Sequence, residues 1–256
     1  MLVDSHCHLD RLNLKPFNGR LDEALAAARA AGVTHFLCVA IDLEHWPAMV
    51  RRVEPWSEVS VSVGVHPSAA RRRSPSVAEL VELARHPKVV AIGETGLDYY
   101  HGKDKERQAD WFRIHIVAAR ETGKPLIIHT REASEDTLRI LSEEKAGEVG
   151  GVIHCFSEDW SVAERAMALN FAISFSGIVT FPSARPIQEV ARRIPAECML
   201  VETDAPYLAP VPWRGQSNQP AWVRQVAEFI ARLRGESLEQ VAAATTANYL
   251  HLFNVQ

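Results

Sequence analysis

Six residues whose side chains bind divalent metal ions lie at the ends of apolar segments of this chain. They are His6, His8, Glu94, His129, His154 and Asp204. Neutral imidazoles and carboxylates together suit a borderline cation such as Zn²⁺ or Mn²⁺. Six such donors exceed the needs of one catalytic ion with open positions, and they are enough for two ions roughly 3.5–4 Å apart. Glu94 is the natural bridge, because its segment lies between the two groups of ligands.

The first apolar segment contributes His6, Cys7 and His8 in succession. Side chains alternate along a β-strand, so His6 and His8 point to one side and Cys7 to the other. We therefore interpret Cys7 as a buried thiol and not as a ligand. Five other histidines end no segment beside another candidate, and we interpret them as surface or hydrogen-bonded side chains: His35, His45, His86, His115 and His251.

Eight short apolar segments rich in Val and Ile carry the candidate ligands. They span residues 2–5, 35–41, 59–65, 89–93, 126–129, 151–154, 171–176 and 199–203. Near-continuous apolar strands are typical of a parallel sheet that is buried on both faces. Their alternation with helical segments favours an α/β fold, a single (β/α)8 TIM barrel over residues 1–256. An open doubly wound sheet is the alternative, but no Gly-x-Gly-x-x-Gly turn follows any segment.

The segments between the strands carry helix signals. Three serines have Glu or Gln three residues later, which predicts capping boxes at Ser76/Glu79, Ser161/Glu164 and Ser237/Gln240. Gly32 and Gly123 follow helical stretches, as C′ glycines do. Residues 107–122 have helical spacing, and residues 206–220 are predicted to form a long loop. Because all strands of such a barrel end at one face, we expect the six ligands to converge at the C-terminal ends of the strands.

The composition is that of an ordinary globular protein, with 256 residues, 47% apolar residues and a formal net charge of −4. This charge gives no general attraction to DNA or to an anionic membrane, so local basic groups and metal ions would have to hold a nucleic acid. No long apolar run or secretory signal appears, so we expect no membrane span. Four scattered cysteines without a Cys-x-x-Cys pair favour a cytoplasmic protein with reduced, buried thiols. A monomer is compatible with the sequence, which leaves the oligomeric state open.

Several motifs resemble the TatD family of metal-dependent deoxyribonucleases, which belongs to the amidohydrolase-like superfamily of barrels. These motifs are Asp4-Ser5-His6-Cys7-His8-Leu9-Asp10, Gly64-Val65-His66-Pro67, Gly93-Glu94-Thr95-Gly96-Leu97-Asp98-Tyr99, His129-Thr130-Arg131-Glu132-Ala133, His154-Cys155-Phe156-Ser157 and Glu202-Thr203-Asp204-Ala205-Pro206-Tyr207-Leu208. The resemblance continues to Asn218-Gln219-Pro220 and thus covers nearly the whole chain. Each motif alone is weak, but their presence in this order is highly specific.

The resemblance implies a two-metal site and a substrate. One ion is then bound by His6, His8 and Asp204. The other is bound by His129 and His154, and Glu94 bridges the two ions where many related barrels have a carboxylated lysine. The resemblance further implies 3′-to-5′ exonuclease activity on DNA, single-stranded or at 3′ ends, with Mg²⁺ as well as Mn²⁺ or Zn²⁺.

The ligand set suits phosphodiester hydrolysis, because two cations lower the pKa of water and neutralise phosphate oxygens. Asp204 would hold one ion and accept the proton of the attacking water. Arg131 can grip a phosphate in bidentate fashion, or it can form an ion pair with Glu132 or Glu135. His66 can bind a phosphate or protonate the leaving oxygen, or it can make a structural hydrogen bond.

The segment after the fourth strand places Tyr99, Tyr100 and His101 beside Lys103 and Lys105. Aromatic residues between basic ones suit stacking on unpaired bases, and Tyr99 is the candidate substrate contact. A solvated surface loop is the alternative. The cluster Arg71-Arg72-Arg73 poses the same choice between a nucleic-acid backbone contact and a solvated charge cluster.

Two other functions stay open at the level of the sequence. The same ligands can polarise a carbonyl, so an amidohydrolase-type hydrolase of a small ester or amide is the nearest rival. A non-catalytic, metal-dependent binding module is the second rival, and the acidic net charge leaves room for it. Arg131 and the lysines after the fourth strand favour a phosphate substrate.

Overall fold

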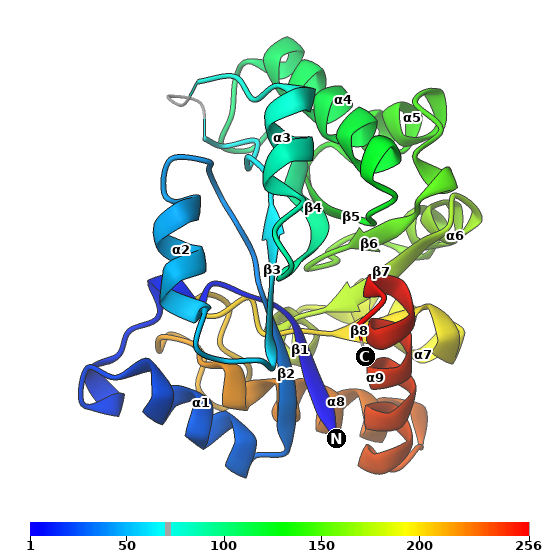
Figure 1. Ribbon diagram of the computed structural model, residues 1–256. Helices are drawn as coiled ribbons and strands as arrows, with labels where there is room; N and C mark the ends of the chain where they lie inside the picture. Colours follow the sequence, from blue (N-terminus) through cyan, green and yellow to red (C-terminus); the bar gives the residue numbers. More distant parts are fainter. Residues whose placement is uncertain (70–72, 256) are drawn as a thin grey trace.

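The computed structural model describes residues 1–69 and 73–255. Its centre is a sheet of eight parallel strands that neighbour one another in sequence order (Figure 1). The strands are β1 Leu2–Cys7, β2 Val33–Cys38, β3 Val59–Val63, β4 Val89–Asp98, β5 Leu126–Arg131, β6 Gly151–Ile153, β7 Phe171–Phe175 and β8 Met199–Val201. Each strand is followed by a helix, so the predicted (β/α)8 TIM barrel is confirmed.

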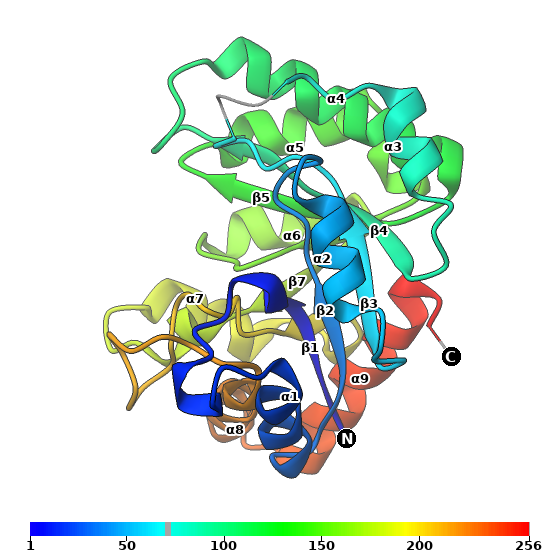
Figure 2. The ribbon, with the colours of Figure 1, turned by 60° about the vertical axis from the view of Figure 1, so that its left-hand side comes forward.

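Helices surround the strands on the outside of the barrel (Figure 2). They are α1 Leu21–Ala30, α2 Trp46–Val53, α3 Val77–Leu83, α4 Lys105–Thr122, α5 Ser134–Glu143, α6 Trp160–Ala168, α7 Arg185–Arg193, α8 Val223–Arg234 and α9 Leu238–Phe253. Among the helices that the structure describes, none has the length and apolar character that a membrane crossing requires.

The barrel closes between its first and last strands, just beyond the end of β8. Cys7 and Ala205 form a parallel bridge, and the His8 N–H donates to the Ala205 carbonyl at 2.8 Å. Buried Asp4 reinforces this seam, because its carboxylate accepts from the Thr203 N–H at 2.8 Å and from the Thr203 hydroxyl at 2.6 Å. Segments from opposite ends of the chain thus become neighbours at the C-terminal ends of the strands.

The predicted helix signals have mixed outcomes. Ser237 forms a complete capping box, and Ser76 accepts from the N–H three residues later. The box predicted at Ser161 is wrong, because the Asp159 carboxylate caps α6 instead and Ser161 lies inside that helix. A carboxylate at this position accepts a free N–H and also interacts favourably with the helix dipole. Gly123 ends α4 in the left-handed conformation, as predicted.

Several strand boundaries differ from those predicted. The fourth strand continues five residues past its predicted end, because Gly96, Leu97 and Asp98 still pair with β5. The eighth strand ends at Val201, so Asp204 lies in the loop beyond it and does not close the strand. Apolar periodicity detects the buried body of a strand, whereas the pairing of its polar end depends on the neighbouring strand.

The inside of the barrel holds a small apolar cluster of its own. It contains Val3, Leu37, Val39, Ala91, Ile127, Val152 and Leu200 from the strands and the residue after β2, together with Tyr249 and Phe253 from α9. Thr246 and Asn248 of α9 donate to the carbonyls of Met1 and Met199, at the starts of β1 and β8, so α9 closes the end of the barrel opposite the candidate ligands. A separate, larger cluster fills the space between strands and helices.

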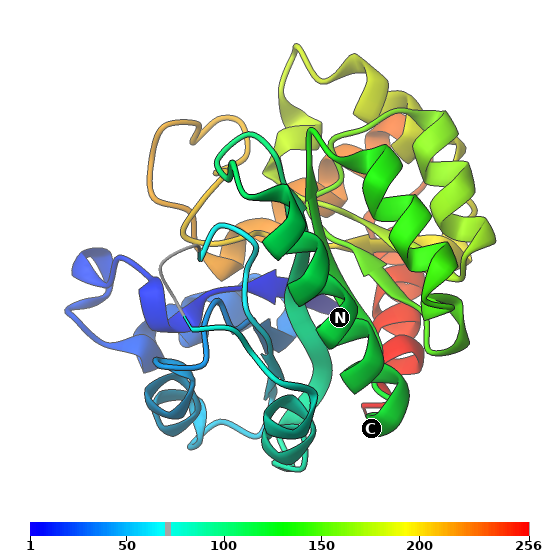
Figure 3. The same cartoon turned by 90° about the horizontal axis from the view of Figure 1, so that it is seen from above.

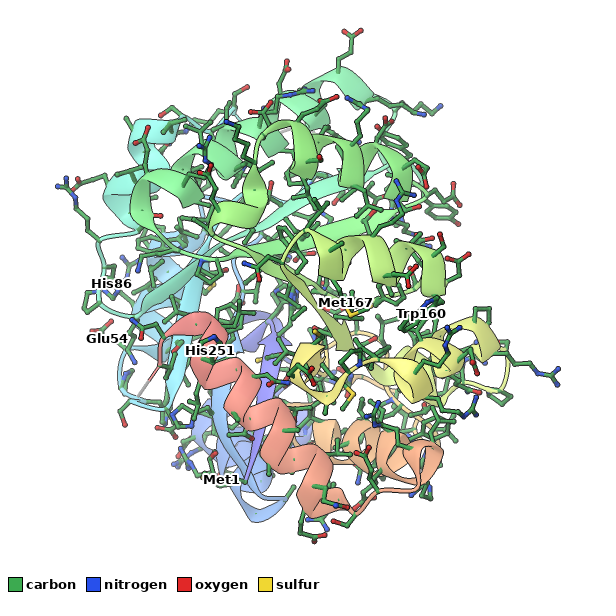
Figure 4. All side chains as sticks on the ribbon, turned by 90° about the vertical axis from the view of Figure 1, so that its right-hand side faces the viewer. Met1, Glu54, His86, Trp160, Met167 and His251 are labelled. Atoms are coloured by element: carbon green, nitrogen blue, oxygen red, sulfur yellow. The ribbon has the colours of Figure 1, made fainter. Side chains whose placement is uncertain are left out.

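We predict that Phe253→Ala lowers the free energy of unfolding by about 3–5 kcal/mol, because it removes a buried aromatic ring from the closed end of the barrel. His251→Ala on the same helix, labelled in Figure 4 and exposed, should change it by no more than about 0.5 kcal/mol. Urea unfolding of both variants measures the difference. Equal effects of the two substitutions would contradict the role of α9 in closing the end of the barrel opposite the candidate ligands.

Candidate metal centre

The Glu94 carboxylate is buried, and imidazoles surround it on both sides. Its Oε1 atom lies 2.8 Å from His154 Nε2, 3.1 Å from His129 Nδ1 and 3.3 Å from His66 Nε2. Its Oε2 atom lies 3.5 Å from His6 Nε2 and 4.0 Å from His8 Nε2. The two oxygens of one carboxylate therefore face two different sets of nitrogen donors.

Asp204 completes the set around Glu94 Oε2. Its Oδ1 atom lies 3.4 Å from His8 Nε2 and 3.7 Å from His6 Nε2. The structure thus brings together all six residues that the sequence singled out as ligands. It adds His66, which stands as close to Glu94 as the other histidines do, from the loop beyond β3.

The orientation of His6 and His8 depends on an irregularity in β1. Val3 belongs to the apolar cluster inside the barrel, whereas Cys7 belongs to the outer core, although strict alternation would put both on one face. The pairing of β1 with β2 shifts by one residue between Asp4 and Cys7. This bulge changes the phase, so that His6 and His8 reach the barrel mouth while Cys7 stays fully buried behind them.

Glu94 is placed by an unusually close approach of neighbouring strands. A side chain at Gly93, where φ is +147°, would put its Cβ 2.7 Å from the Ile127 carbonyl oxygen, so only glycine fits. The buried Ser62 hydroxyl donates to the Gly93 carbonyl at 2.6 Å and accepts from the Ala40 N–H. The Glu94 N–H donates to the Ala40 carbonyl at 3.1 Å, so the backbone at Gly93 and Glu94 is held by β3, β5 and the segment after β2.

Three of the histidines have their outer ring nitrogen bound to a fixed acceptor. The Nδ1 atom of His8 forms a hydrogen bond with the Val39 carbonyl at 2.9 Å. The Nδ1 atom of His154 forms one with Glu202 Oε1 at 3.2 Å. The Nε2 atom of His129 forms one with Asp98 Oδ2 at 3.3 Å. When these outer nitrogens donate, the inner nitrogens present lone pairs to carboxylate oxygens. Two facing lone pairs need a cation or a proton between them, as in carboxylate–histidine–metal sites.

His6 gives a second, independent indication of a cation. Both of its ring nitrogens are buried, and neither has a hydrogen-bond partner among the described residues. Its Nε2 atom lies just too far from the two carboxylates for hydrogen bonds. Two ligands that each lie about 2.1 Å from a tetrahedral ion are roughly 3.4 Å apart, so these spacings fit donors that share a divalent cation.

The electrostatics of the cluster keep its carboxylates charged. Burial opposes ionisation of Glu94, but His154, His66 and His129 outweigh it and hold its pKa well below the usual range. The pKa of Asp204 is likewise lowered, because His8 and His6 outweigh its burial. Burial and the neighbouring His154 lower the pKa of His6, so that its imidazole is neutral. The neighbouring carboxylates outweigh burial and raise the pKa values of His8, His129 and His154, so a cation would have to displace protons from these three rings.

Two carboxylates that hold the histidines were missed from the sequence. Glu202 accepts from the Cys155 N–H at 2.7 Å as well as contacting His154. Asp98 accepts from the His101 N–H at 2.8 Å as well as contacting His129. Both stand in the quoted motifs, and Glu202 lies two residues before Asp204. The spacing of Glu202 and Asp204 could have marked Glu202 as a site residue. Which histidine each carboxylate contacts depends on strand register.

The cluster lies at the bottom of a cavity of about 730 Å³, which is in the usual size range for small-molecule sites. Arg131 lines this cavity, and its guanidinium lies 4.1 Å above the ring of Tyr100. Neither carboxylate considered as its partner pairs with it, and Glu135 pairs with Arg165 instead. Arg131 thus has no ion pair within residues 1–69 and 73–255, which favours the phosphate-binding interpretation.

The remaining residues that the sequence suggested as substrate contacts differ in whether they line the cavity. His66 lines it, and its Nδ1 atom accepts from the Ser68 N–H at 3.1 Å. Tyr99 does not reach it, because its hydroxyl donates to Asp136 and its ring lies under Lys105. Arg71 and Arg72 lie outside the described residues. Arg73 pairs with Glu79, as expected for a solvated charge cluster.

The four cysteines are free thiols, as expected. Cys7 and Cys38 are fully buried, but the expected burial fails for Cys198, which is half-buried, and for Cys155, which lines the cavity. Partial burial and the nearby carboxylates of Asp204 and Glu202 raise the pKa of the Cys155 thiol well above its usual value, so it is a neutral side chain beside the candidate metal ligands.

Comparison with known proteins gives a consistent result. The TatD-related DNase family matches residues 3–254. The uncharacterized metal-dependent hydrolase YcfH of Escherichia coli (strain K12) is 48% identical over 99% of this chain and 96% of its own length. The uncharacterized metal-dependent hydrolase YabD of Bacillus subtilis (strain 168) is 40% identical over the whole of both chains.

Solved structures of similar proteins have the same fold as this chain. The crystal structure of YjjV, a TatD homolog from Escherichia coli K12, superposes with a TM-score of 0.92 at 31% identity and covers 100% of this chain and 98% of its own. A TatD family hydrolase from Entamoeba histolytica has the same fold, with a TM-score of 0.85 at 21% identity over 98% of this chain and 97% of its own. With its clusters of His, Glu and Asp at the strand ends, this chain is a metal-dependent hydrolase that belongs to the TatD-related DNase family.

Proposed function

We propose that this protein hydrolyses phosphodiester bonds of DNA from a strand end, with two divalent cations at the barrel mouth. The observation that carries the proposal is the position of Glu94 between two sets of donors. One of its oxygens faces His6 and His8, and the other faces His129 and His154. Such a carboxylate is placed to bridge a pair of ions. The family's description as DNases supports DNA as the substrate, and the 3′-to-5′ polarity follows the resemblance.

The cations would be held by residues from both halves of the chain. One would be held by His6, His8 and Asp204, the other by His129 and His154, with Glu94 shared between them. When bound, divalent cations supply Lewis acidity that neutralises phosphate oxygens and lowers the pKa of water. The preponderance of imidazole favours Zn²⁺ or Mn²⁺ over Mg²⁺.

Three side chains of the protein then bind the phosphate or transfer protons. The Asp204 carboxylate accepts the proton of the attacking water, because its lowered pKa keeps it ionised. The Arg131 guanidinium, which has no carboxylate partner among the residues that the structure describes, holds phosphate oxygens in bidentate fashion. Because the Nδ1 atom of His66 accepts from Ser68, a neutral His66 carries its proton on Nε2, which faces Glu94 Oε1 at 3.3 Å. His66 would donate this proton to a phosphate or leaving oxygen in place of the carboxylate.

We predict that Asp204→Asn lowers kcat for single-stranded DNA by at least about a thousandfold, because an amide neither accepts the proton nor binds a cation as a carboxylate does. Asparagine tolerates the left-handed backbone at this position, where φ is 57°, so the fold should persist. Asp110→Asn on the exposed side of α4 serves as the matched control. Near-normal turnover by the Asp204 variant would overturn the proposed role.

The carboxylates behind the histidines give a second prediction. Asp98→Asn should weaken Zn²⁺ binding by about 10–100-fold, because the charge that orients His129 is lost. Asp136→Asn, on the same side of the barrel but bonded to Tyr99, should leave the affinity unchanged. Competition with a chromogenic chelator measures both variants. If the two variants bind Zn²⁺ equally, the supporting role of Asp98 is excluded.

Metal stoichiometry tests the bridge. Metal analysis should find two divalent ions per chain, and Glu94→Gln should retain fewer than two. The metal-depleted protein should regain phosphodiesterase activity when Mn²⁺, Zn²⁺ or Mg²⁺ is added.

Hydrolysis of simple esters or amides in preference to single-stranded DNA would favour an amidohydrolase function instead. Metal uptake without any turnover would favour a non-catalytic binding module.

A further inference from the structure

One side of the cavity is an apolar wall formed by Ile178, Tyr207 and Leu208. Ile178 comes from the 3-10 turn after β7, and the other two residues follow β8. Tyr207 is 47% exposed, and its ring centroid lies 6.0 Å from that of His8. The wall therefore begins directly beside the donors around Glu94 Oε2, and none of its three side chains takes part in the chemistry described so far.

Hydrogen bonds hold this wall in place. The Tyr207 N–H donates to the Asp204 carbonyl at 2.8 Å, and the Asn218 side-chain amide donates to the Tyr207 carbonyl at 2.6 Å. The same amide donates to the Thr203 carbonyl at 2.8 Å, which ties the far end of the loop back to β8. The Tyr207 backbone is thus fixed, although its ring is half exposed. This arrangement also gives the Asn218-Gln219-Pro220 motif a structural purpose.

The two loops that form the wall are also locked to each other. The Val211 N–H donates to the Thr180 hydroxyl at 2.9 Å. The Leu208 carbonyl oxygen lies so close to Gly177 that a side chain at this position would clash with it. The wall is therefore formed before any ligand arrives, which reduces the entropy that binding must overcome.

Arg131 and Tyr100 lie on the other side of the barrel mouth. Arg131 ends β5 and Tyr100 follows β4, and at least two strands separate β5 and β4 from β8 in the circular order. Figure 2 shows the loop after β8 (orange) and the loop after β4 (green) at opposite edges of the same end of the barrel. Figure 3 shows both loops projecting beyond the strands. A chain laid across the mouth would meet the apolar wall, the metal donors and then the Arg131–Tyr100 pair.

We propose that the wall of Ile178, Tyr207 and Leu208 is the subsite for the base of the terminal nucleotide, and that the Arg131–Tyr100 pair receives the next nucleotide. This inference rests on the proposed function, because it places the scissile phosphate at the metal donors. A nucleotide carries its flat base one sugar away from that phosphate, beside His8. The exposed face of Tyr207 then stacks on the base, and stacking accepts any of the four bases.

The wall further selects an unpaired end. A base that stacks on Tyr207 inside the cavity cannot also be paired with a complementary strand, because a cavity of about 730 Å³ is on the scale of a small ligand. The protein would then bind any terminal base but would require a base to be present.

Binding of a product-like ligand tests the subsite without turnover. The metal-loaded protein should bind deoxyadenosine 5′-monophosphate about tenfold more tightly than deoxyribose 5-phosphate, and Tyr207→Ala should abolish that preference. Tyr207→Phe is the matched control and should keep the preference, because the ring is retained. Calorimetric titration measures the affinity of each of the three proteins for both ligands. The inference is overturned if Tyr207→Ala weakens both ligands equally, or if the two ligands bind equally to the unmodified protein.

Hydrolysis separates a failure of the subsite from a failure of the proposed function. On single-stranded DNA, Tyr207→Ala should lower kcat/KM about tenfold through KM, and it should have no effect when the terminal residue is abasic. If the unmodified protein hydrolyses DNA but ignores the terminal base, the subsite is wrong and the function stands. If it hydrolyses no DNA, the proposed function fails, and the titration above still decides whether the wall binds a base.

Discussion

The centre of this structure depends on one buried carboxylate. A buried anion is strongly destabilising unless it is paired and hydrogen-bonded, and Glu94 has imidazoles on every side. Each imidazole in turn needs a fixed orientation, which Val39, Asp98 and Glu202 provide to three of them. The stability of the barrel mouth and its affinity for cations are therefore two consequences of the same network.

The seam between β8 and β1 decides whether this network exists. His6 and Asp204 approach each other only because the two strands join at Cys7 and Ala205, with Asp4 clamping Thr203 behind them. The bulge in β1 is a second requirement, since it turns both histidines toward the mouth. Apolar packing at the opposite end, around α9, holds the strands in register without intruding on the polar end. Stability and chemistry are thus assigned to different ends of the barrel, as is general for this fold.

In the proposed function, the rim around the cluster directs a metal-dependent scaffold to a phosphodiester. Arg131 is a guanidinium without a carboxylate partner among the described residues, and it faces the same cavity as the metal donors. Related barrels use similar centres on other substrates, so the loops and not the ligands must choose among them. Here the segments after β7 and β8 supply an apolar wall, the loop after β4 supplies an aromatic ring, and the end of β5 supplies a positive charge.

The sequence by itself determined the barrel and the six candidate donors, because apolar periodicity and the chemistry of His, Asp and Glu are local properties. It also determined that Cys7 would point away from the site, although it did not reveal the bulge on which this depends. Only the tertiary structure decided that Glu202 and Asp98 orient the histidines, and that Tyr99 is turned away from the cavity. These contacts join residues from different strands and loops. They depend on register and loop packing, which no local pattern of residues encodes.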